Sequence, residues 1–261
     1  MVIVFIIIFG LVVGSFLNVL ILRLPNKESV IRGRSHCPSC KHTLGFFDLF
    51  PILSFLFLGG KCRYCHKKIS IQYPLVEAVT ALLFLMAYFV FIPEGEAISY
   101  FPLLKLARAW FFISAMIIIF VYDFKKYLIL DRVIYPSIIV ALLTIPLFLD
   151  GRLEKNIFWG IFLAAVLGGG FFLLQYVVSH GKWVGGGDVK MGVLMGLILG
   201  LNGILVALFF AYIIGAIFSL WFIASKQKTM KDALPFGPFL AGGTIISLFW
   251  AEPIIKLFFS L

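Results

Sequence analysis

The chain has 261 residues, of which 62% are apolar and 13% are charged, and its mean hydropathy is +1.09. Soluble domains are about 45–50% apolar and about 25% charged, so this composition excludes an ordinary soluble domain and also a disordered chain. The net charge is +10. This charge does not indicate a nucleic-acid partner, because the basic residues cluster in particular loops, as they do in helical membrane proteins.

Eight apolar runs are long enough, or nearly long enough, to cross a membrane as helices. They are continuous rather than alternating, which predicts an all-α polytopic membrane protein. The first run lacks a basic segment before it and a small-residue cleavage site after it, so we expect a retained helix rather than a cleaved signal peptide. The runs cover residues 2–22, 75–93, 103–121, 133–149, 157–178, 190–201, 203–224 and 237–259.

The runs divide the chain into three parts. Residues 1–22 form the first transmembrane helix, and residues 75–261 form a membrane domain of seven helices. Residues 23–74 are polar and basic, contain all four cysteines, and form what we call the four-cysteine module. With the N-terminus outside and the spans alternating, 17 of the 22 basic residues fall on the cytoplasmic side. This excess predicts a multi-pass protein whose four-cysteine module lies in the cytoplasm.

The cysteines form two C-x2-C pairs separated by 21 residues, Cys37 with Cys40 and Cys62 with Cys65. Two residues between thiolates let one turn present both sulfurs to one ion, and two such turns complete the tetrahedral site that zinc prefers. Because protein would fill all four positions, the sequence predicts a structural zinc site, which could supply folding energy to a small module. Redox-active dithiol pairs and inert thiols are the alternatives.

Two aspartates fall at the same cytoplasmic boundary, Asp123 after the third run and Asp188 before the sixth. Placing an acidic side chain at the edge of a bilayer costs free energy, so each such residue is expected to have a functional or structural role. Asp188 follows Gly185, Gly186 and Gly187, which permit close backbone approach or unusual dihedral angles. Two nearby carboxyls can share a proton, one acting as general base toward water while the other polarises a carbonyl.

A structural explanation of these acidic residues stays open on spacing alone. The two aspartates could cap helices or pair with basic neighbours. Asp131 and Glu77 are further acidic candidates, and both could be structural, Glu77 as the partner of a basic loop side chain. The possible basic partners of the two aspartates are Lys125, Lys126 and Lys190.

Six segments in this order resemble the type IV prepilin peptidase family, the prepilin leader peptidase/N-methyltransferases of bacterial membranes, over nearly the whole chain. One departure is visible: the family usually has proline where Leu130 precedes Asp131, which favours a structural role for Asp131. The segments are Gly14–Asn18 with Arg23–Pro25, the two cysteine pairs flanking Pro51–Ser54, Tyr73–Glu77, the segment around Asp123, Gly185–Lys190 and Leu234–Pro238.

The resemblance implies a membrane aspartyl endopeptidase of the GxGD type, with Asp123 and Asp188 as catalytic residues and Gly185, Gly186, Gly187 and Lys190 in a substrate loop. Its substrates would be type IV prepilins or pseudopilins, cut after a short basic leader at the cytoplasmic face of the bacterial plasma membrane. The implied second activity is methylation of the new N-terminus with S-adenosylmethionine. Likeness to competence-type members suggests pseudopilins of DNA uptake.

Three other classes of function compete with a prepilin peptidase. A proton- or metal-coupled transporter would use Asp123 and Asp188 as membrane carboxylates, but transport sites lie near the membrane midplane rather than at one face. A zinc metalloprotease needs a His-Glu-x-x-His motif, which this sequence lacks. A membrane thiol oxidoreductase requires the cysteines to cycle between dithiol and disulfide.

Overall fold

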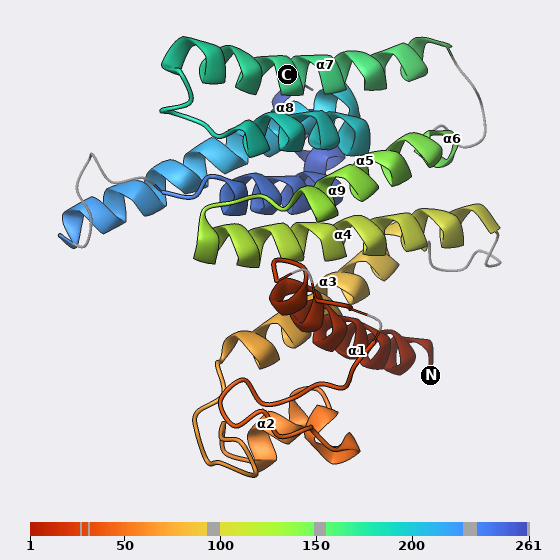
Figure 1. Ribbon diagram of the computed structural model, residues 1–261. Helices are drawn as coiled ribbons and strands as arrows, with labels where there is room; N and C mark the ends of the chain where they lie inside the picture. The colour runs from red at the N-terminus through yellow and green to blue at the C-terminus, as the bar shows by residue number, and fades with distance from the viewer. Residues whose placement is uncertain (27, 31, 93–99, 149–154, 227–233, 260–261) are drawn as a thin grey trace. The chain divides into compact units, whose positions relative to one another are not determined.

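The computed structural model describes residues 1–26, 28–30, 32–92, 100–148, 155–226 and 234–259, and their regular secondary structure is helical (Figure 1). The chain forms two compact units, Met1–Glu94 and Gly95–Leu261. The first unit contains α1 (Val2–Arg23), the 3-10 helix η1 (Phe46–Leu49), α2 (Leu53–Phe57) and α3 (Gln72–Phe91). The second contains α4 (Tyr100–Lys126), α5 (Asp131–Leu143), α6 (Ile145–Phe148), α7 (Lys155–Ser179), α8 (Gly186–Ala224) and α9 (Gly237–Phe259).

Six helices of the described residues are long and apolar enough to cross a membrane: α1, α3, α4, α7, α8 and α9. This confirms a helical multi-pass membrane protein. We expected eight spans, and six are found among the described residues. The number eight therefore stays a prediction. The fourth predicted run, residues 133–149, overlaps the 13-residue helix α5, which at 1.5 Å per residue is shorter than the hydrocarbon core of about 30 Å.

The sixth and seventh predicted runs lie together in α8, which is interrupted at Gly200. The element has 39 residues, which as one straight helix would extend about 58 Å, roughly twice the hydrocarbon thickness. Gly200 has φ 68° and ψ −174°, a backbone conformation that only glycine adopts without strain. The sequence therefore placed the interruption within a few residues of where it occurs.

Side chains of other helices bond the backbone near this interruption. Arg108 of α4 donates from Nη2 to the carbonyl oxygen of Ile198 at 3.4 Å and from Nε to the hydroxyl of Thr144 at 3.1 Å. Ser247 of α9 donates to the carbonyl oxygen of Gly203 at 2.7 Å. Such bonds are needed because an apolar environment offers no water to a backbone carbonyl.

Small residues bring the helices of the second unit into close contact. α8 packs against both α7 and α9, and α9 also packs against α4, as Figure 1 shows. A Cβ atom added at Gly192 of α8 would clash with the backbone of Gly168 in α7, and one added at Gly243 of α9 would clash with that of Ala207. This close packing brings the ends of α4, α8 and α9 that carry Asp123, Asp188 and Gly237 toward one another.

In the first unit, α1 packs on α3 through small residues. A Cβ atom added at Gly10 would lie 2.6 Å from the Cα atom of Ala81, and one at Gly14 would lie 2.7 Å from the Cα atom of Glu77. Asn18 is buried on the same face and donates from Nδ2 to a backbone carbonyl of α3 at 3.1 Å. The first helix therefore uses its small and polar residues for helix packing, as in other membrane bundles.

Candidate active site and metal centre

The four cysteines of the four-cysteine module come together in the structure. One sulfur atom from each lies within 4.8 Å of the others, with Cys37 and Cys62 buried, Cys65 half-buried and Cys40 exposed. Four convergent thiol groups with these spacings fit a tetrahedral ion such as zinc, and they would fill all four of its coordination positions. The residues thus form a candidate structural metal centre.

Two turns with the same hydrogen bonds build this cluster. In the first turn, the backbone N–H of Cys37 donates to the carbonyl of His42, and the N–H of Lys41 donates to the carbonyl of Cys37, both at 2.9 Å. In the second turn, the N–H of Cys62 donates to the carbonyl of Lys67, and the N–H of His66 donates to the carbonyl of Cys62, again at 2.9 Å. Each pair of sulfurs is therefore held by its own backbone.

The electrostatics of the first turn favour a thiolate. Burial opposes ionisation of the Cys37 thiol, but backbone hydrogen bonds from Cys40 and Ser39 outweigh it, and together the effects lower the pKa of Cys37 to about 7. Thiolate, not thiol, is the form that binds metals.

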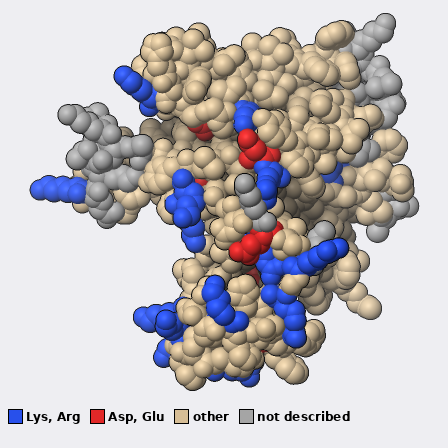
Figure 2. Space-filling view, viewed as in Figure 1, with Lys and Arg blue, Asp and Glu red and all other residues tan. Residues whose placement is uncertain are grey.

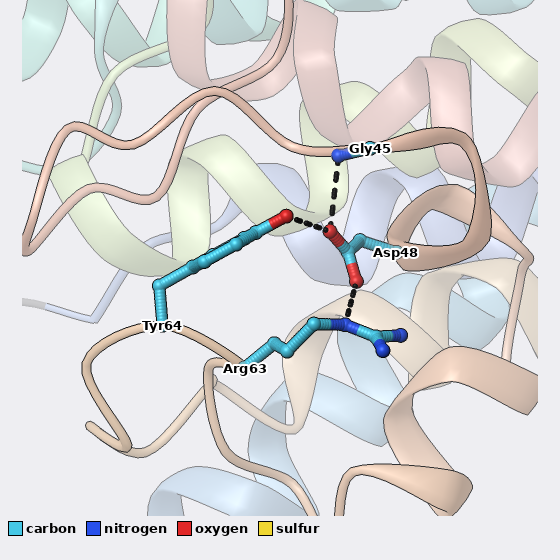
Figure 3. A network of polar contacts seen from close by, with 4 residues as sticks. All are labelled: Gly45, Asp48, Arg63 and Tyr64. Atoms are coloured by element: carbon cyan, nitrogen blue, oxygen red, sulfur yellow. Dashed lines mark hydrogen bonds and ion pairs between the residues drawn. The ribbon is translucent and has the colours of Figure 1, made fainter.

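Asp48 links the two halves of the module (Figure 3). Its carboxylate accepts hydrogen bonds from the backbone N–H of Gly45 at 3.0 Å, from Nε of Arg63 at 2.7 Å and from the hydroxyl of Tyr64 at 3.1 Å. Burial acts to raise the pKa of Asp48, but the bonds from Gly45, Arg63 and Tyr64 outweigh it and hold that pKa below its ordinary value. The charged carboxylate is thus the form that stabilises the module.

Asp48→Asn is expected to destabilise the four-cysteine module by about 1–2 kcal/mol at neutral pH, because it breaks a buried charge-assisted network whose Arg63 end is half exposed. Faster limited proteolysis within residues 32–71 would measure this loss, with Glu28→Gln as the control. The stabilisation exists above the ordinary pKa of aspartate and is lost as pH falls through the lowered value. The difference between the two proteins should therefore disappear in acid, and a difference that grew there would contradict this assignment.

In the second unit, the structure brings Asp123 and Asp188 into electrostatic contact. Asp123, at the end of α4, is 4% exposed, and Asp188, in the first turn of α8, is 8% exposed. The negative charge of Asp188 acts on the carboxyl group of Asp123. Two carboxyls from residues 65 positions apart in the sequence are thus neighbours at one end of the helices.

Backbone N–H groups hold one oxygen of each carboxyl. The N–H of Gly237, the first residue of α9, donates to Oδ2 of Asp123 at 2.9 Å, and the N–H of Gly185 donates to Oδ2 of Asp188 at 2.8 Å. Asp188 therefore caps its own helix, and Asp123 bonds the start of another. The capping explanation of these residues is compatible with chemistry, because each carboxyl retains a second oxygen.

The other sequence-predicted site residues have different surroundings. Lys190 forms an ion pair with Asp131 at 2.5 Å and lies 5.0 Å from the ring centre of Tyr135, so its partner is Asp131 rather than Asp123 or Asp188. Glu77 accepts a hydrogen bond from the backbone N–H of Ile52 at 2.8 Å. This partner is a backbone group rather than the basic side chain considered above.

Of the two features that glycines before Asp188 permit, close backbone approach and unusual dihedral angles, the structure shows only the first, because their dihedral angles are ordinary. Gly186 and Gly187 lie in the first turn of α8, and none of the three glycines has a positive φ. A Cβ atom at Gly187 would lie 3.0 Å from the side chain of Ile129, whereas one at Gly186 would meet nothing within 4 Å. Close approach at Gly187 and open space at Gly186 are the features that the structure supports.

Gly237 was part of a recognised segment, but its contact with Asp123 was not predicted. A Cβ atom added at Gly237 would lie 2.5 Å from Oδ2 of Asp123. We therefore expect Gly237→Ala to displace this carboxyl and to lower any activity that depends on it by about 100-fold, as small misplacements of reacting groups do. Gly242→Ala in the same helix has open space and is the matched control. Equal activity of the two variants would contradict the positioning role.

Comparisons with known proteins bear on both units. The sequence model of the bacterial peptidase A24 N-terminal domain matches residues 8–91, and that of the type IV leader peptidase family matches residues 110–220. The chain is 36% identical over 254 residues to a prepilin leader peptidase/N-methyltransferase of Bacillus subtilis (strain 168), covering 96% of this chain and 95% of the relative. It is 31% identical over 278 residues to one of Legionella pneumophila, covering 95% and 91%. No solved structure matches.

Proposed function

Because this chain belongs to the type IV leader peptidase family, we infer that it cleaves the leader from type IV prepilins and then methylates the new N-terminus. Asp123 and Asp188 are our proposed catalytic pair. The observation that supports this most directly is that the two buried carboxyls interact while each keeps one oxygen beyond its backbone hydrogen bond. The family assignment gives the transporter alternative no support.

The proposed peptidase reaction needs one carboxylate and one carboxylic acid. The carboxylate takes a proton from a water molecule, whose oxygen attacks the carbonyl carbon of the scissile peptide bond. The carboxylic acid donates a hydrogen bond, and then its proton, to the carbonyl oxygen as charge develops there. When the intermediate collapses, the C–N bond breaks and the departing amine takes the proton that the first carboxyl had removed from water, while the second carboxyl takes back a proton from a hydroxyl of the intermediate as its carbonyl re-forms. Since the pair shares one proton before each turnover, it titrates as a unit.

We place this reaction at the cytoplasmic face of the bacterial plasma membrane, with the N-terminus of the chain outside. The excess of basic residues on one side supports this orientation. A prepilin is itself an apolar helix behind a charged leader, so its scissile bond would lie at the membrane boundary. The ends of α4 and α8, which carry Asp123 and Asp188, would lie at the same depth.

Zinc is our proposed ion for Cys37, Cys40, Cys62 and Cys65, in a structural role that leaves no coordination position for water. For the second activity, S-adenosylmethionine would supply an electrophilic methyl group to the free amine that cleavage creates. The four-cysteine module and the first helix are the parts that we propose contribute to this step. The substrates are type IV prepilins or pseudopilins.

Purified full-length chain incubated with a prepilin in detergent would test both activities. We expect the intact mass of the pilin to fall by the mass of its leader, and to rise by one methyl group when S-adenosylmethionine is also present. A chelator should affect the stability of the module more than leader cleavage. A pilin whose mass never changes would contradict the proposed peptidase, whereas cleavage without a methyl group would contradict only the transferase.

A further inference from the structure

We propose that residues 46–57 of the four-cysteine module, here called the aromatic segment, dock on the membrane surface and insert their outer side chains among the lipids. The segment comprises η1, α2 and the residues between them, and only Asp48 and Ser54 in it are polar. This membrane contact would be additional to the membrane-spanning helices. It goes beyond the proposed catalytic function.

The aromatic segment faces outward with its apolar side chains. Phe46 is 74% exposed and Phe57 is 85% exposed. The rings of Phe46, Phe47 and Phe50 contact one another, with centres 5.1–6.2 Å apart. Other large apolar side chains of the segment are also exposed, namely Phe47, Leu49, Phe50, Leu53 and Leu56. Exposed apolar side chains gathered in one short segment mark an interaction site in a folded protein.

The one charged side chain of the same segment, that of Asp48, points into the module. Asp48 lies between Phe47 and Leu49 in the sequence, yet its side chain is 5% exposed and bonds Gly45, Arg63 and Tyr64 inside the module. A segment with its charge inside and its aromatic rings outside is arranged for apolar rather than aqueous surroundings.

A hydrogen bond ties the aromatic segment to the first turns of the span α3. The backbone N–H of Ile52 donates to Oε2 of Glu77 at 2.8 Å. Glu77 is five residues beyond Gln72, where the span α3 begins, and therefore about 8 Å along the helix. Taking the start of α3 as the membrane surface, this bond lies at the depth, about 5–10 Å, at which interfacial helices bury their apolar faces. The lipids that surround α3 are thus the natural occupant of this surface.

The charge around the segment favours anionic lipids. In Figure 2, basic side chains gather on the lower part of the view, where Figure 1 places the four-cysteine module. Polybasic segments next to a membrane helix are attracted to anionic headgroups. The exposed basic residues of the module include Arg32, Arg34, Lys41, Lys61, Arg63, Lys67 and Lys68.

A photocrosslinking experiment on the full-length chain tests this proposal. The photoreactive residue p-benzoylphenylalanine is placed at position 57, and the protein is reconstituted into phosphatidylethanolamine/phosphatidylglycerol vesicles with radiolabelled acyl chains. The matched positions are Leu82, an exposed residue of the span α3, and Thr43, an exposed uncharged residue just after the first cysteine turn. We expect lipid adducts at position 57 to approach the yield at position 82 and to exceed that at position 43 several-fold.

The same experiment separates lipid from protein occupants. Adducts of position 57 with added prepilin or with a second copy of this chain, in place of lipid, would overturn the proposal, as would a lipid yield no higher than at position 43. Omitting phosphatidylglycerol should lower the yield at position 57 more than at position 82. Asp188→Asn should leave the lipid adducts unchanged, so failure of the proposed catalytic pair and failure of membrane docking would be distinguishable.

Discussion

Asp123→Asn and Asp188→Asn are each expected to lower the rate of leader cleavage by about 10³-fold or more, because neither a single carboxyl nor an amide can supply both the base and the acid. Asparagine keeps an oxygen that can accept the backbone hydrogen bond from Gly237 or Gly185, so both variants should fold. Cleavage of a prepilin by equal amounts of membrane-extracted protein measures the effect.

Asp131→Asn is the matched control for these two variants. It makes the same chemical change at the ion pair with Lys190, which joins α5 to α8. A loss of cleavage in this control as large as in the other two would show that the assay responds to any aspartate near the boundary. Full activity of either Asp123→Asn or Asp188→Asn would remove that residue from the catalytic pair.

Cys62→Ser is expected to abolish stoichiometric zinc binding and to open the four-cysteine module to protease. Serine replaces a thiolate ligand by a hydroxyl, and folding of small metal-bound modules depends on the free energy of metal binding, about 10–16 kcal/mol in zinc-finger peptides. Metal analysis of the purified chain should give about one zinc for the unchanged protein and much less for the variant.

His42→Ala is the control for the cysteine variant. Its ring stacks on that of Tyr64 with centres 3.6 Å apart, beside the metal centre, while its contribution to the cysteine turn is a backbone carbonyl that alanine retains. Zinc content should therefore survive in His42→Ala. Unchanged zinc in Cys62→Ser would contradict the four-cysteine site, and loss of zinc from both variants would mean that the site needs the histidine.

Local sequence signals predicted much of this architecture. Hydropathy located the spans within a few residues, because each helix must carry its own apolar surface. The cysteine spacing anticipated the cluster, since two residues between cysteines suffice to bring their sulfurs together. The positions of Asp123 and Asp188 relative to the spans placed them at one boundary, and the structure makes them neighbours in the second unit.

Contacts between distant segments could not be predicted in this way. The bond from Gly237 to Asp123 joins residues 114 positions apart, and no periodicity in the sequence encodes it. The network of Asp48 and the bond from Ile52 to Glu77 likewise depend on how loops fold back on helices. Hydropathy alone also does not determine the number of transmembrane helices, because a short apolar run such as residues 133–149 can form a helix that is too short to cross the membrane alone.

Arg108 joins parts of the chain that are synthesised at different times. Its partners Thr144 and Ile198 follow it by 36 and 90 residues. Before those residues emerge from the ribosome, α4 contains a permanently charged guanidinium without these two acceptors, and such a charge is costly in hydrocarbon. We therefore expect α4 to stay beside the translocation machinery, or at the lipid surface, until α8 has been made. The order in which helices settle into the bilayer would then differ from their order of synthesis.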